Sequence, residues 1–143
     1  MPNIHPFLVH FPIALLTVSF LADLAATLTR NEDLHKVGWW TLLLGTLGLA
    51  ASVVTGLLAE STITIPREAK EFFEVHEQIG FIVSAIFIFL FLWRIASRTH
   101  LPTRNRIWFH IFSLIGVILI WMGAWYGGEM VYRFGVGVGV PPQ

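Results

Sequence analysis

Two histidines and two prolines stand close together near the start of the chain, in the stretch HPFLVHFP from His5 to Pro12. This stretch opens an apolar segment that runs to about Leu28, and crossing a bilayer takes roughly 20 mostly apolar residues. His10 lies about one turn inside the segment, where an ionisable side chain is costly and usually has a partner. The sequence therefore first raises the question of what His10 binds.

A second histidine, His76, lies just before the third apolar segment. If both helices continue to the same side, His10 and His76 lie at similar depth on different helices, as the two axial ligands of a haem b do. Gly80, one turn beyond His76, would leave room for the porphyrin. Arg67 and Arg133 would then be available to the haem propionates. This pattern predicts a haem b near one face of the membrane.

Two other interpretations of these histidines stay open. Each imidazole would also be satisfied by a hydrogen bond to a carboxylate or a backbone carbonyl at the membrane interface. A directly ligated metal ion is disfavoured, because no two donors on this side have the H-x-x-x-H, H-E-x-x-H or E-x-x-H spacing by which one helix aims two ligands at one ion. The donors on this side are His5, His10, His76, Glu60, Glu77 and Glu129.

An acid and a base lie toward the opposite end, Asp23 in the first apolar segment and Arg94 at the end of the third. At a rise of 1.5 Å per residue, the two side chains reach similar depth. Neither is tolerated alone in lipid, so the sequence predicts a buried ion pair, which His110 would join. We expect the pair to fix the register of two helices. A proton path would need relay groups in the middle of the membrane, where the chain offers only Ser, Thr and aromatic residues.

The composition is that of a membrane protein. The 143-residue chain is 55% hydrophobic and 13% charged, against about 45–50% and about 25% in soluble domains. Its formal net charge is zero and its basic residues are scattered, which excludes a nucleic-acid-binding protein. The absence of Cys excludes disulfides, cysteine-ligated iron–sulfur clusters and covalently attached haem. No nucleophile elbow, Walker loop or dinucleotide fingerprint occurs, so a carrier or accessory subunit is favoured over an enzyme.

The apolar segments predict a single domain over residues 1–143, an all-α integral membrane four-helix bundle that runs up-down-up-down. The first helix lacks a preceding basic side chain, so we expect it to be retained and not cleaved as a signal peptide. Gly127 and Gly128 predict the end of the fourth helix, and residues 129–143 predict an extended C-terminal tail that folds back over the bundle. The predicted helices are about 6–28, 37–59, 66–98 and 106–127.

The basic residues predict the orientation. Short cytoplasmic loops are enriched in Lys and Arg. Most of the basic residues lie at the end that carries the first and third connectors, which favours a multi-pass protein of the bacterial inner membrane with both termini in the periplasm. Six of the nine basic residues lie there: Arg30, Lys36, Arg94, Arg98, Arg104 and Arg106.

Two motifs resemble the signature of a known family. HPFLVHFPIALL at the start and GGEMVYRFGVGV near the end are similar to the motifs of domain-of-unknown-function family 2231 (DUF2231), small four-helix bacterial membrane proteins. The resemblance covers essentially the whole chain, including Asp23 and His76. It implies a four-helix fold, and the occasional fusion of family members to Rieske or cytochrome c domains implies redox work. Related tails often carry a histidine where this chain has Phe134, so no tail ligand is expected here.

These observations favour an electron-transfer subunit that binds one haem b near the outer face, with His10 and His76 as ligands of the iron. Its partners would be the lipid bilayer and either other membrane subunits or a periplasmic redox protein. The alternative is a cofactor-free structural or assembly subunit of a larger respiratory or photosynthetic membrane complex. An absorption spectrum separates the two.

Overall fold

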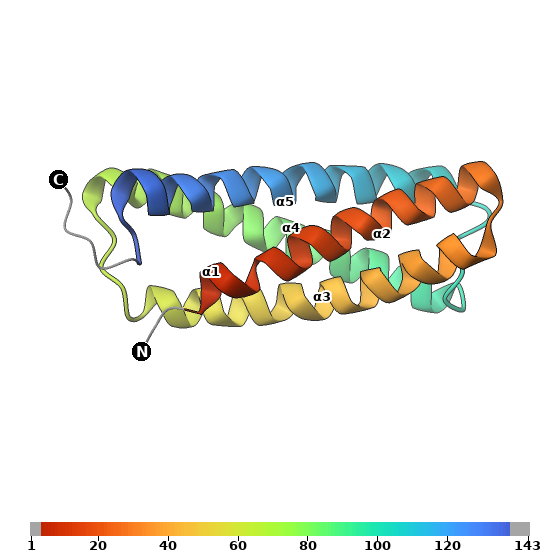
Figure 1. Ribbon diagram of the computed structural model, residues 1–143, viewed down its shortest axis with the longest axis horizontal. Helices are drawn as coiled ribbons and strands as arrows, with labels where there is room; N and C mark the ends of the chain where they lie inside the picture. Colours follow the sequence, from red (N-terminus) through yellow and green to blue (C-terminus); the bar gives the residue numbers. More distant parts are fainter. Residues whose placement is uncertain (1–3, 138–143) are drawn as a thin grey trace.

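A computed structural model describes residues 4–137 of the chain, and it has no strand in that range. Four long helices run side by side in alternating directions (Figure 1), which confirms the predicted all-α four-helix bundle. The connection between α3 and α4 lies at the same end as α1, and the other two connections lie at the opposite end. The elements are α1 (His5–Leu8), α2 (His10–Thr29), α3 (Glu32–Glu60), η1 (Arg67–Ala69), α4 (Lys70–Ala96) and α5 (Arg106–Phe134).

All four long helical segments can cross a bilayer. They are the spans His5–Thr29, Glu32–Glu60, Arg67–Ala96 and Arg106–Phe134, each long and apolar enough by length and composition. Large apolar side chains are exposed on the outside of every helix, among them Leu21, Leu47, Leu92 and Trp121. A soluble monomer rarely exposes so much contiguous apolar surface, so these side chains face lipid.

The bundle consists of two helical hairpins. α2 packs along α3 and α4 packs along α5, while the hairpins meet through α2 with α5 and α3 with α4. The core between them includes Leu16, Val83, Phe87, Leu90 and Phe109, each no more than 1% exposed. At the end that carries α1, Figure 1 shows α2 beside α3 and separated from α5. The hairpins therefore diverge at this end.

The first predicted helix is interrupted at Val9, between α1 and α2. Pro12 explains the break, because its ring clashes with the carbonyl of residue 8 and it has no N–H to donate. The short α1 packs on α3. His5 and His10 are five positions apart, so at about 3.6 residues per turn they point to different sides of this segment.

The second helix begins at Glu32, before the predicted residue 37. Asn31 caps it: the side-chain oxygen accepts hydrogen bonds from Asp33 N at 2.9 Å and Leu34 N at 3.4 Å. An Asn followed by acidic residues is a helix-start signal, because their charge complements the helix dipole. The earlier start places His35 inside α3.

The fourth helix does not end at Gly127 and Gly128; it continues for about two further turns to Phe134. It ends where Gly135 adopts a left-handed conformation (φ 66°), with the Gly135 N–H donating to Val131 O at 3.0 Å. The extended tail is therefore wrong for residues 129–134. Met130 and Val136 are buried against Ala69 in a small apolar cluster over the α3–α4 connection, and residues 138–143 of the predicted tail lie outside the described residues.

Candidate functional site

A cavity of about 380 Å³ lies between the two hairpins at the end that carries α1. Its lining is mostly apolar and comes from all four spans. Some lining residues are exposed on the outside of the bundle, including Leu57 of α3, Phe81 of α4 and Tyr132 of α5. The cavity therefore reaches the lipid-facing surface between the hairpins. Its volume falls within the roughly 300–1,000 Å³ of small-molecule and cofactor sites.

Two histidine rings lie close together in this cavity, His5 of α1 and His76 of α4. Their centroids are 6.3 Å apart and their planes are inclined at 85°. Glycines on the neighbouring helices leave room for the rings: a Cβ on Gly56 would lie 3.1 Å from His5 Cε1, and one on Gly127 would lie 3.2 Å from His76 Cε1. Gly127 thus leaves space for an imidazole without ending its helix.

A hydrogen bond fixes the tautomer of the His76 ring. His76 Nδ1 lies 2.8 Å from Gly123 O, and a carbonyl only accepts, so Nδ1 carries the hydrogen. Nε2 of His76 then keeps the lone pair, the arrangement that orients metal-binding imidazoles. The His5 ring is held from α3, where Nδ1 lies 3.3 Å from the Thr55 hydroxyl and the ring also interacts with the Ser52 backbone.

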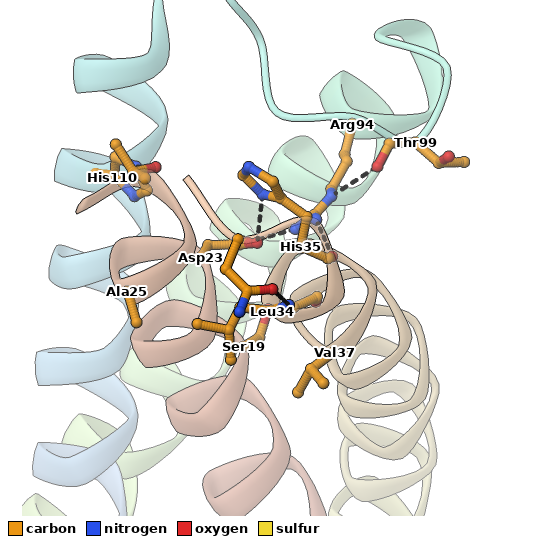
Figure 2. Close-up of polar contacts among 12 residues, drawn as sticks. Ser19, Asp23, Ala25, Leu34, His35, Val37, Arg94, Thr99 and His110 are labelled. Atoms are coloured by element: carbon orange, nitrogen blue, oxygen red, sulfur yellow. Dashed lines mark hydrogen bonds and ion pairs between the residues drawn. The ribbon is translucent and has the colours of Figure 1, made fainter. Parts of the chain in front are cut away.

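The predicted ion pair is present at the other end of the bundle. Arg94 Nη1 donates to Asp23 Oδ2, and both residues are at most 1% exposed. The rest of the guanidinium is used by backbone carbonyls: Nη2 donates to His35 O at 2.9 Å and Nε to Thr99 O at 3.1 Å (Figure 2). Arg94 therefore ties α4 to α2, to the start of α3 and to the α4–α5 connection.

A family model described as "Predicted membrane protein (DUF2231)" matches residues 1–140. The chain belongs to the DUF2231 family. The match covers both hairpins of this DUF2231 protein, together with the cavity and the ion pair. Comparison with the curated proteins and with the solved structures found no match.

Not all the predicted ligand residues of the DUF2231 chain come together. His10, His76 and Gly80 all line the cavity, but His10 is exposed, and the ring that lies near His76 is that of His5. Helix periodicity explains the difference, because a spacing of five positions at about 3.6 residues per turn places His5 and His10 on different sides of the helical segment. Gly80 leaves open space, since a Cβ there would meet nothing within 4 Å.

Arg67 and Arg133 do not line the cavity. Both are exposed, and Arg133 lies 5.3 Å from the Phe134 ring and 4.0 Å from the Glu129 carboxylate. No Lys or Arg is found among the cavity-lining residues of the described chain. The structure therefore gives these two arginines no contact with a group inside the cavity.

The histidine beside the ion pair is His35, not His110. His35 Nδ1 lies 3.9 Å from Asp23 Oδ1, whereas His110 Nε2 is hydrogen-bonded to Thr27 Oγ1 at 3.0 Å. His110 therefore contacts α2 about one turn beyond Asp23. The sequence signal for His35 was the Asn31 cap, which places His35 in the first turn of α3.

Gly38 is predicted to be essential for the ion pair, because a Cβ there would overlap the Asp23 carboxylate. Gly38→Ala should lower the free energy of unfolding by about 1–3 kcal/mol, the usual cost of overpacking a buried site. Gly128→Ala is the matched control, since a Cβ at Gly128 meets nothing within 4 Å. Unfolding of both variants in detergent micelles checks this; equal stability would show that Asp23 moves aside without cost.

Proposed function

We propose that the cavity binds one haem b, with His5 and His76 as the axial ligands, and that the protein is an electron-transfer subunit. The spacing of the two imidazoles carries the proposal. Two imidazoles on opposite sides of one metal ion, each about 2 Å from it, have ring centroids about 6 Å apart. The observed separation is 6.3 Å. The hydrogen bond to Gly123 O orients His76 with Nε2 as its metal-binding atom.

The donor set favours haem over a bare metal ion. Among residues 4–137 no group of three His, Cys, Asp or Glu side chains could hold an ion. A structural zinc site needs four protein ligands and a catalytic one needs three. Haem needs only one or two protein ligands, because the porphyrin supplies four nitrogens. When bound, its iron supplies one-electron chemistry.

The lining of the cavity suits the apolar porphyrin of a haem. It is lined largely by aliphatic and aromatic side chains and glycines, and it extends between the hairpins to their outer surfaces. Among residues 4–137, no Lys or Arg lines the cavity to pair with the propionates. They would therefore extend to the water at the nearby end of the bundle and would not pair with Arg67 or Arg133 inside the cavity.

An optical spectrum tests this proposal. The protein purified from haem-replete cells should show a Soret band and, after reduction with dithionite, the sharp α band of a six-coordinate haem, with one haem per chain. A colourless protein that also fails to take up added haemin would contradict the proposal. The result would then favour the cofactor-free structural or assembly subunit, in which His5 and His76 simply pack together.

The orientation belongs to the same proposal. Four spans place both ends of the described chain on one side, and the three basic residues at that end, against six at the other, favour both termini in the periplasm of a bacterial inner membrane. A reporter fused after Gln143 should be active only if it works in the periplasm. Activity of a cytoplasm-only reporter would reverse the orientation. With the predicted orientation the haem lies near the outer face, within reach of a periplasmic redox protein or a neighbouring membrane subunit.

A further inference from the structure

Four buried polar atoms at the end opposite the cavity have no hydrogen-bond partner within the described chain. They are Asp23 Oδ1, His35 Nδ1, Arg106 Nε and His110 Nδ1. Buried polar atoms are nearly always satisfied, by protein or by ordered water. His35 and His110 interact electrostatically with each other and with Arg106, so these groups belong to one end of the bundle.

Asp23 and His35 are the central pair of this region. Arg94 occupies Asp23 Oδ2 and leaves Oδ1 facing His35 Nδ1 at 3.9 Å. This separation is too long for a direct hydrogen bond. A carboxylate oxygen only accepts, so the pair lacks a hydrogen to share unless His35 Nδ1 carries one. Either water that donates to both atoms or a proton on His35 satisfies the two atoms.

We propose that Asp23 and His35 form a proton-binding pair that exchanges with the aqueous phase at this end. The His35 side chain is 17% exposed and that of Asp23 is 2% exposed, so His35 connects the buried carboxylate to the solvent. A hydronium ion of the aqueous phase transfers its proton to the neutral His35 ring: its O–H bond breaks, an N–H bond forms and a water molecule is released. The imidazolium then donates from Nδ1 to Asp23 Oδ1.

The surrounding charges limit this site to one proton. Carboxylates favour the added positive charge and the nearby arginines oppose it. The second histidine, His110, opposes a further proton once the first is bound. The titratable and charged groups around the pair are Glu32 at the start of α3, Arg94 of α4, His100 in the α4–α5 connection, and Arg106 and His110 of α5.

Nuclear magnetic resonance of the full-length protein in micelles, labelled at His and Asp, tests the proposal. In the wild type the signals of His35 and Asp23 should change with pH at one shared midpoint, because they hold the same proton. Asp23→Asn should weaken the proton affinity of His35 about tenfold or more, which is a shift of one pH unit. A His35 signal that is constant over the pH range of the folded protein, or that is unchanged in Asp23→Asn, would overturn the proposal.

Two further variants keep the test decisive if Asp23→Asn does not fold. His35→Gln should abolish the pH-dependent change at Asp23, whereas a change that persists at the same midpoint would contradict a shared proton. Arg104→Ala is the control, because Arg104 is exposed at the same end of the bundle. It should leave the shared midpoint in place. These measurements need no haem, so their outcome is independent of the cavity.

Discussion

His76→Ala is expected to abolish the six-coordinate haem spectrum and to weaken haem binding strongly. Loss of an outer hydrogen-bond partner of a metal ligand already costs roughly 10–100-fold in affinity, and loss of the ligand itself should cost more. His5→Ala should have a similar effect, because the His5 ring lies 6.3 Å from the His76 ring in the same cavity. Haemin titration of each purified variant, followed by the Soret band, measures the loss.

His10→Ala is the matched control for these variants. His10 lines the same cavity but is exposed, so its removal should leave the spectrum and the affinity close to wild type. If His10→Ala lost the haem and His5→Ala kept it, the ligand pair would be His10 and His76, as the spacing in the sequence suggested. If all three variants retained the haem, none of these histidines would be a required ligand.

Removal of either member of the Asp23–Arg94 pair is expected to give the largest loss of stability. A lone buried charge is left behind in each case, which typically costs about 3–5 kcal/mol. Arg94→Ala also leaves His35 O and Thr99 O without their donor. The double variant should be little worse than either single one, because both lose the same interaction. Denaturant unfolding in micelles gives the four free energies.

Arg104→Ala serves as the control for that cycle, since Arg104 is exposed at the same end of the bundle and should change stability by little. Strictly additive losses at Asp23 and Arg94 would mean that the two side chains act separately. A loss as large in Arg104→Ala would point to a general effect of removing basic residues there.

The fold could be predicted from the sequence because the lipid bilayer strongly restricts the structures that can cross it. A spanning segment must satisfy its own backbone, so long apolar runs become helices and short polar connectors make them antiparallel. The predicted helix bounds were wrong at some helix ends. Gly127 and Gly128 suggested an end, yet Gly127 serves to admit the His76 ring and the helix continues to Gly135. The sequence alone does not distinguish a glycine that allows close packing from a glycine that ends a helix.

The ion pair could be predicted from depth in the membrane, whereas the ligand pair also depends on side-chain direction. Asp23 and Arg94 are the charges that lipid cannot tolerate alone, so depth along straight helices was enough to match them. His5 and His10 differ in direction because they are five positions apart on a helical segment. Depth alone favoured His10, whereas the His5 ring is the one that lies 6.3 Å from the His76 ring. His35 lies beside the Asp23–Arg94 pair because it is in the first turn of α3. In the sequence, the capping residue Asn31 is the signal that places His35 there.

Electron paramagnetic resonance of the ferric protein tests the central claim, that His5 and His76 would together hold one haem iron. Two imidazole ligands would make the bound iron six-coordinate, and a low-spin ferric signal is expected from the wild type. A high-spin signal, as one protein ligand alone would give, would contradict the pairing of His5 with His76.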